Sequence, residues 1–294
     1  MSRAANWMGY GNETPEELLE RAMRSDQEGD VYTAVKLFRI LLRKEPEWVQ
    51  PFWELAQIYR RRREWKPLMH YSLCVLDREP GKKEAWQDLG LSATAMGKYQ
   101  VARLAWNKLD YPKNGHAGFH KPESIALALD TIHGQEVVLA DRIDPVQALV
   151  RSIPQPSSGY HYGDLILIDL RDTDRVIVRK EVYPVYRELE RLKMAHTQTF
   201  SAILHTSDTL QLDFLRKLCA QRGLGFDNWS KSERQTNWTR PDGMEYYREL
   251  HEDSDPIAFS IVALAGQKAT TALEVLRAWK QITLVDYNRL FRLG

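Results

Sequence analysis

The sequence predicts an α+β protein, in which an N-terminal array of helical repeats is followed by a β-rich α+β domain with a helical C-terminal extension. Three observations support this fold class: a regular repeat in the first part of the chain, short alternating segments in the middle, and apolar residues at helical spacing in the last quarter. The chain has 294 residues, about twice the usual size of one domain, so we expect two domains.

The first part of the chain, residues 15–112, consists of three copies of the repeat. The phrase Glu-Pro ends at Pro46 and again at Pro80, so the period of the repeat is 34 residues. In the same frame, the position where the two helices of a repeat cross holds Ala34, Leu68 and Ala102. Small residues let two antiparallel helices pack closely. The second repeat therefore either closes less tightly at Leu68 or is compensated by the small Ser72.

This pattern resembles the tetratricopeptide repeat (TPR) family, in which the first helix of every repeat lines a concave groove. The resemblance implies that the groove binds a peptide segment of another protein. The candidate partner-binding residues there are Trp53, Gln57, Arg60, Gln87 and Leu91. Trp53 is the expected anchor, because a large rigid aromatic side chain gives much contact area for little loss of entropy. The other tryptophans nearby, such as Trp86 and Trp106, occupy packing positions.

Two features of the array argue against other ligands. Family members that grip the C-terminal carboxylate of chaperone tails use Lys and Asn on the first helix, where this chain has Leu19 and Met23. The four consecutive arginines at 60–63 could bind a phosphate or an acidic partner. The following Glu64 and the neutral charge balance favour a solvated turn instead.

A segment rich in Gly, Pro and Asn, residues 113–124, is the predicted linker to a β-rich α+β domain over residues 125–230. Short strands are expected at 124–129, 135–142, 148–153, 164–170 and 175–179, separated by turn residues. They suggest a small antiparallel sheet or a half-open barrel. A helix at 185–194, a strand at 199–205, a helix at 208–222 and a short strand or loop to Trp229 are expected to follow.

The last part of the chain, residues 243–294, is predicted to be helical and to pack on the β-rich domain. Apolar residues recur at helical spacing over 243–251, 256–264 and 267–282. The acidic run before Pro256 is suited to capping a helix, and the nearly all-apolar segment that follows is expected to be buried.

The β-rich region over 125–192 resembles a domain of bacterial TPR-containing proteins, many of which are encoded near polymorphic toxins. The resemblance rests on Asp144-Pro145 and on the phrase from Gly159 to Asp164. It implies an immunity protein that binds a toxin. A polar aromatic surface for the partner would consist of Arg142, Tyr160, His161, Tyr162 and Asp164. The alternative is structural: Asp144 and Asp164 bond backbone amides, and the glycines permit turns.

Composition excludes several function classes. Lys and Arg number 41 and Asp and Glu number 40, so the net charge of +1 argues against a nucleic-acid partner. No apolar run approaches the length of a membrane span, and we expect no membrane partner. Two distant cysteines and an N-terminus without the features of a signal peptide favour the cytoplasm.

The search for chemistry yields no catalytic site. The sequence carries no phosphate-binding loop, no nucleophile elbow and no paired Cys-x-x-Cys. His116 and His120 have a spacing that binds metals on a helix, but they lie in the Gly-rich linker without a nearby carboxylate or thiolate. We expect no enzyme activity, no cofactor and no metal.

Two functions remain open. The chain is either an immunity protein that neutralises a cognate bacterial toxin by blocking its active site, or a TPR adaptor or scaffold for a peptide-bearing client in a bacterial assembly or secretion system. Both require a protein partner. They differ in what binds, because an inhibitor grips one folded enzyme tightly whereas an adaptor binds short peptides weakly.

Overall fold

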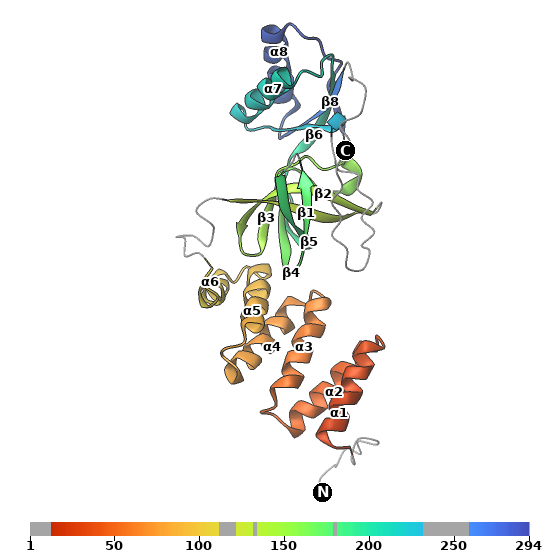
Figure 1. The fold of residues 1–294 in the computed structure, drawn as a ribbon, viewed down its shortest axis with the longest axis vertical. Coiled ribbons are helices and arrows are strands. Elements are labelled where there is room, and N and C mark those ends of the chain that lie inside the picture. The colour runs from red at the N-terminus through yellow and green to blue at the C-terminus, as the bar shows by residue number, and fades with distance from the viewer. Residues whose placement is uncertain (1–12, 112–121, 132–133, 179–180, 232–258, 294) are drawn as a thin grey trace. The chain divides into compact units, whose positions relative to one another are not determined.

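The computed structural model describes residues 13–111, 122–131, 134–178, 181–231 and 259–293. The chain divides into two compact units, Met1–Ala117 and Gly118–Gly294. The expected α+β fold class is confirmed, with a helical repeat array first and a β-rich unit with a C-terminal helix after it (Figure 1).

The first unit contains six helices that pack as three consecutive pairs (Figure 1). They are α1 (Pro15–Gln27), α2 (Val31–Lys44), α3 (Val49–Arg61), α4 (Trp65–Arg78), α5 (Lys83–Ala95) and α6 (Tyr99–Lys108). Each pair corresponds to one copy of the repeat. The described helices therefore account for all three repeats that the sequence predicts.

Local signals set the ends of these helices. Helix α1 begins with a capping box, in which the Thr14 hydroxyl accepts from the backbone N–H of Glu17 and the Glu17 carboxylate accepts from the N–H of Thr14. Two residues after the end of the first helix of each repeat, the backbone is left-handed, at Gly29, Arg63 and Gly97. Glycine adopts this conformation without steric cost, and Arg63 does so at φ 57°.

The crossing of each helix pair is closely packed. Ala34 and Leu68 are fully buried and Ala102 is nearly so. In the second repeat the larger Leu68 and the small Ser72, which stands where the other repeats have Phe38 and Trp106, are both fully buried. Compensation of Leu68 by Ser72 stays a prediction that agrees with this burial.

The second unit begins with a closed barrel of five strands. They are β1 (Glu123–Thr131), β2 (Gly134–Asp144), β3 (Gln147–Val150), β4 (Leu165–Val178) and β5 (Glu181–Lys193), and a short 3₁₀ helix, η1 (Pro156–Ser158), precedes β4. Sequential neighbours pair antiparallel. With an odd number of strands, the first and the last run in the same direction, so β1 and β5 close the barrel as a parallel pair.

The predictions for the last two strands of the barrel are wrong. The strands expected at 164–170 and 175–179 are one strand, β4, whose pairing with β5 shifts register between Ile168 and Thr173. The helix expected at 185–194 is strand β5. Its Glu, Arg and Leu residues favour a helix locally, but Tyr186 and Glu188 are buried and Arg187 is exposed, which is the alternation of a strand.

The described residues after the barrel form a four-stranded antiparallel sheet with its helices. Its elements are β6 (Gln198–Leu204), α7 (Thr209–Gln221), β7 (Gly225–Asn228), the 3₁₀ helix η2 (Trp229–Lys231), β8 (Ser260–Gly266), α8 (Ala269–Thr283) and β9 (Phe291–Leu293). The strand order is β7-β8-β6-β9. Each long helix therefore connects two parallel strands that are separated by a third strand, which is the split β-α-β arrangement of a ferredoxin-like sheet.

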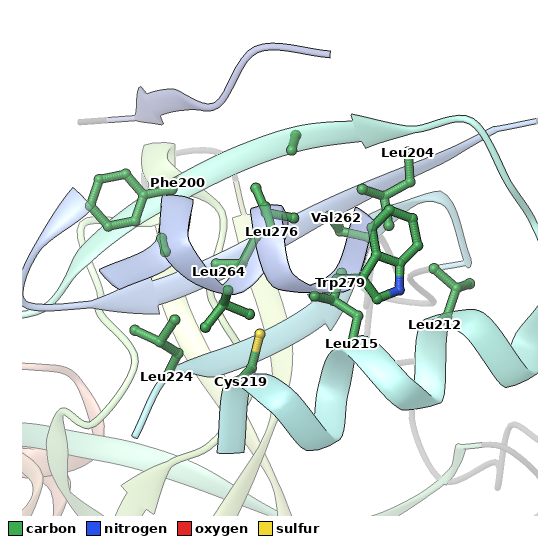
Figure 2. Close-up of a cluster of buried hydrophobic side chains, with 13 residues drawn as sticks. Phe200, Leu204, Leu212, Leu215, Cys219, Leu224, Val262, Leu264, Leu276 and Trp279 are labelled. Atoms are coloured by element: carbon green, nitrogen blue, oxygen red, sulfur yellow. The ribbon is translucent and has the colours of Figure 1, made fainter. Parts of the chain in front are cut away.

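The core of this sheet lies between its strands and the two helices (Figure 2). Phe200 and Leu204 of β6, Val262 and Leu264 of β8, Leu212, Leu215 and Cys219 of α7, and Leu276 and Trp279 of α8 form one buried cluster. The indole N–H of the fully buried Trp279 donates to the carbonyl of Gln211 at 2.9 Å. Burial also raises the pKa of the Cys219 thiol to about 12, so this cysteine is a packing residue.

The last part of the chain contributes strands as well as a helix. Helix α8 matches the helix expected at 267–282, but residues 260–264 of the helix expected at 256–264 belong to strand β8 (Ser260–Gly266). This apolar segment pairs on both edges, with β6 and with β7, so the sheet overrides its helical spacing. The helix expected at 243–251 lies outside the described residues.

Gly90 provides a test of the repeat packing. A Cβ atom at this position would lie 2.5 Å from the indole of Trp106. Glycine to alanine in a helix usually stabilises by about 1 kcal/mol. We instead expect Gly90→Ala to lower the free energy of unfolding by about 2 kcal/mol, because the rigid ring must move. Urea unfolding followed by helical circular dichroism measures this change.

The matched control is the same substitution in a Trp106→Phe background. The smaller ring leaves room for the added methyl group, so Gly90→Ala should then cost much less. A wild-type background that gains stability from Gly90→Ala would contradict the described packing of α5 against α6.

Candidate partner-binding site

The first helices of the three repeats carry a continuous row of polar and aromatic side chains. We call this row, made of Asp26 on α1, Trp53, Glu54, Gln57 and Arg60 on α3, and Asp88 on α5, the first-helix face. Its α3 residues recur three or four positions apart, which places them on one side of the helix. Contacts between α3 and the two flanking first helices hold the row together.

Asp88 organises the part of this face between α3 and α5. Its carboxylate accepts from Arg60 Nε at 3.0 Å and from Gln57 Nε2 at 3.1 Å. Asp88 is 1 % exposed, so the pair with Arg60 is almost completely shielded from water. Breaking such a pair leaves a buried charge and is costly. Gln57 and Arg60 therefore join two repeats, in addition to any contact that they make with a partner.

Trp53 packs with one side and carries a cation on its ring. The indole lies against the apolar cluster of α3, α4 and α5 that includes Val75, Leu76 and Leu89. Lys82 Nζ lies 4.5 Å from the ring centroid, in the range of a cation–π interaction. The side chain remains partly exposed. Packing on one side fixes the ring, which keeps the entropic cost of using it as an anchor low.

The two candidates on α5 differ. Gln87 is partly exposed and stays a candidate for partner contact. Leu91 is 3 % exposed, so it offers a partner almost no surface and we reassign it to packing. Residues 88–94 of α5 are all buried, which the repeat frame by itself does not reveal.

The consecutive arginines are engaged within the array. Arg60 pairs with Asp88, Arg61 donates to both carboxylate oxygens of Asp26, and Arg62 pairs with Glu64. Arg63 is the left-handed residue two positions after the end of the first helix of its repeat. These arginines therefore have structural tasks, which favours the turn over a phosphate-binding patch.

The second candidate surface, around 142–164, is structural in most of its side chains. Arg142 is 7 % exposed and donates to Glu123, to the Tyr186 hydroxyl and to the carbonyl of Pro145. Tyr160 packs on the barrel core and donates its hydroxyl to Glu188. Arg142 therefore offers a partner little surface and is corrected, whereas Tyr160 stays partly exposed and remains a candidate.

Asp164 holds the turn that contains His161. Its fully buried carboxylate accepts from the backbone N–H groups of His161 and Ala195, at 2.9 Å and 2.6 Å, and from Arg191 Nη1 at 3.2 Å. The His161 side chain is 36 % exposed, with Nδ1 3.9 Å from Asp164. His161 is therefore partly exposed and remains a candidate for contact with a partner.

Tyr162 belongs to a joint between the barrel and the sheet. It packs with Trp229 on the cluster of Ile153, Ala263 and Ala265, and its ring fits against Gly225. The backbone of Ile153 is held on both sides, since its N–H donates to Asp227 and its carbonyl accepts from the Trp229 indole. The sequence reveals no signal for this joint, because its members come from distant parts of the chain.

Two searches of the described residues bear on other functions. Over the part of the chain that the structure describes, His, Cys, Asp and Glu nowhere gather in threes that could hold a metal ion. His116 and His120 lie outside these residues. No helix among those described combines the length and apolar character needed to cross a membrane.

Several solved structures are similar to part of the chain. No family model and no curated protein sequence matches the chain. Similar solved structures include MamA, at 15 % identity and a TM-score of 0.31, where the alignment covers 32 % of this chain and 56 % of MamA. The chain thus spans just over half the length of MamA.

Two further TPR structures align with the same third of the chain. The first TPR of Spaghetti (RPAP3), bound to the HSP90 peptide SRMEEVD, is 14 % identical with a TM-score of 0.30, covering 32 % of this chain and 75 % of that one. The C-terminal TPR-containing domain of a Plasmodium falciparum FK506-binding protein is 16 % identical with a TM-score of 0.29, covering 33 % and 80 %. The neighbours of the N-terminal third are TPR proteins.

The burial of Asp144 predicts that the stability of the barrel depends on pH. Its carboxylate accepts from the backbone N–H of Val146 at 2.9 Å, but burial raises its pKa to about 6. The folded barrel therefore binds this proton more tightly than the unfolded chain does. The stabilisation that this bound proton gives to the folded barrel is complete below about pH 4 and is lost as the pH rises through about 6. The free energy of unfolding of the barrel therefore falls by about 2 kcal/mol between about pH 4.5 and pH 7.

Asp144→Asn keeps the acceptor for Val146 and removes the titration. From about pH 4.5 to pH 7, the wild-type barrel should therefore lose about 2 kcal/mol of opening free energy that the variant keeps. Hydrogen exchange of the barrel amides at the two pH values measures it. An identical pH dependence in both proteins would show that Asp144 is ionised in the folded barrel without cost.

Proposed function

We propose that the chain is a protein-binding module whose first-helix face receives a segment of a partner protein, with Trp53 as the anchor. The observation that supports this most directly is the row itself, in which a partly exposed indole is held rigidly beside amide and charged groups over three consecutive repeats. Aromatic side chains fixed in this way are the typical energetic centres of protein interfaces. The proposal assigns the chain no chemistry of its own.

We further propose that the partner is a bacterial toxin, which the chain would neutralise in the cytoplasm as an immunity protein. The support is the resemblance of residues 125–192 to a domain of TPR-containing proteins encoded near toxins. In this scheme the first-helix face would bind the toxin, and His161 of the second unit would be a separate candidate contact. Inhibition by coverage needs a large interface and no catalytic group.

An adaptor or scaffold is the second candidate. One feature favours it: the proposed anchor and its polar neighbours all lie on three first helices, so a short segment could be bound without the second unit. An adaptor would bind isolated peptides in the micromolar range, whereas an immunity protein would bind a folded enzyme in the nanomolar range.

Trp53→Ala tests the anchor. We expect the variant to bind the partner with a free energy weaker by about 2 kcal/mol, because the fixed indole loses its contact area. Titration calorimetry with the partner captured from the host lysate measures the affinity. Tyr32→Ala, which removes an exposed aromatic from the second helix of the first repeat, is the matched control and should bind as the wild type does. Equal affinities of both variants would move the interface away from the first-helix face.

The toxin proposal has its own test. The purified chain, mixed in equimolar amounts with the captured partner, should abolish the enzymatic activity of that partner, and co-expression should protect cells from it. A partner that is bound through the first-helix face but keeps its full activity would reject the immunity role and leave the adaptor.

A further inference from the structure

The first-helix face contains two junctions between neighbouring repeats, and their charges differ. At the second junction, Asp88 of the third repeat contacts Arg60 of the second. The equivalent residues at the first junction are Glu54 and Asp26, because each lies one repeat period earlier in the chain. An acid thus meets a base at one junction, and an acid meets an acid at the other. The charges at equivalent positions of the two junctions can therefore be compared directly.

The second junction is neutral and closed. Arg60 and Gln57 together satisfy both carboxylate oxygens of Asp88. The Arg60 side chain is also largely buried. A carboxylate at this repeat position is therefore compatible with burial when a cation comes from the preceding repeat.

The first junction lacks that cation. Arg61 Nη2 lies 2.7 Å and 2.6 Å from the two oxygens of Asp26, which occupies this arginine. Glu54 accepts from the side-chain amide of Gln50, and among the described residues no cation forms an ion pair with it. Lys82 is turned elsewhere, with Nζ 3.7 Å from Glu79 and over the ring of Trp53.

The half-buried Glu54 is consequently an unfavourable place for a negative charge. Burial raises the pKa of its carboxyl, and the charge of Asp26 raises it further, while Gln50, Arg61 and Lys82 act in the opposite direction. A cation brought to this position would relieve the desolvation and the repulsion together. Trp53 precedes Glu54 on the same helix, and its ring already attracts the ammonium group of Lys82.

We propose that the first-helix face takes a basic-apolar segment, in which a Lys or Arg side chain of the partner pairs with Glu54 and a neighbouring apolar side chain packs on Trp53. The inference rests on the proposed function and adds the chemistry of the bound segment. The partner's cation would occupy at the first junction the place that Arg60 occupies at the second. An acidic C-terminal segment would meet Asp26 and Glu54 and be repelled.

Labelled peptides of about twelve residues provide the test, because extended segments of this length can span several repeats. Three peptides share one apolar sequence with a central Phe and differ only at the next residue, which is Lys, norleucine or Glu. Fluorescence polarisation with the full chain at low salt measures their affinities. We expect the Lys peptide to bind about ten-fold more tightly than the norleucine peptide, and the Glu peptide to bind most weakly.

The variants localise the preference. Glu54→Gln keeps the bond to Gln50 and should abolish the advantage of the Lys peptide. Asp26→Arg introduces the arginine that the second repeat has at this position and should abolish it as well. Glu20→Gln is the matched control, since Glu20 is an exposed acid at the same repeat position in the first repeat, and it should leave the preference intact.

The outcomes separate the two proposals. If peptides bind and Trp53→Ala weakens them, but Lys has no advantage or Glu54→Gln leaves that advantage unchanged, the charge inference is overturned and the proposed binding face stands. If no peptide binds, or if Trp53→Ala leaves all affinities unchanged, the proposed face itself is rejected.

Discussion

Close packing of two helices in each repeat is the constraint on which the first unit depends. Because every helix pair crosses at a buried position, Ala34, Leu68 or Ala102, equivalent residues of successive repeats occupy equivalent places. The first-helix face follows directly from this regularity. Its polar residues are aligned by the packing of apolar residues on the opposite side of the same helices.

The same regularity makes single departures informative. Ser72 is small where Phe38 and Trp106 are large, and it accompanies the one large residue at a crossing. Asp26 stands where the next repeat has Arg60. As a result, Glu54 lacks the cation that its equivalent in the third repeat, Asp88, has in Arg60. The first departure lies entirely in the interior, because Leu68 and Ser72 are both fully buried. At the second, no cation among the described residues pairs with Glu54, which is why we assign that pairing to a partner.

The second unit obeys a different constraint, which is closure. Five strands in a meander remove both sheet edges only if the first and last pair in parallel, and β1 and β5 do so. The polar side chains around 142–164 serve this closure and the joint to the four-stranded sheet. Arg142, Tyr160 and Asp164 are consequently committed to internal partners. Residues that look like a binding surface in sequence are here the means by which a small barrel satisfies its buried polar groups.

The sequence by itself determined the repeat array, the β-rich character of the region after it and the position of Trp53, because a constant repeat period and a change of hydrophobic period are local properties of the chain. Only the tertiary structure decided that 181–193 and 260–266 are strands, since pairing with distant strands overrides the helical preference of their residues. It also decided that Leu91 and Arg142 are buried and that Asp88 is neutralised by Arg60. Burial and ion pairing depend on which residues from distant parts of the chain meet, and no pattern within one segment carries that information.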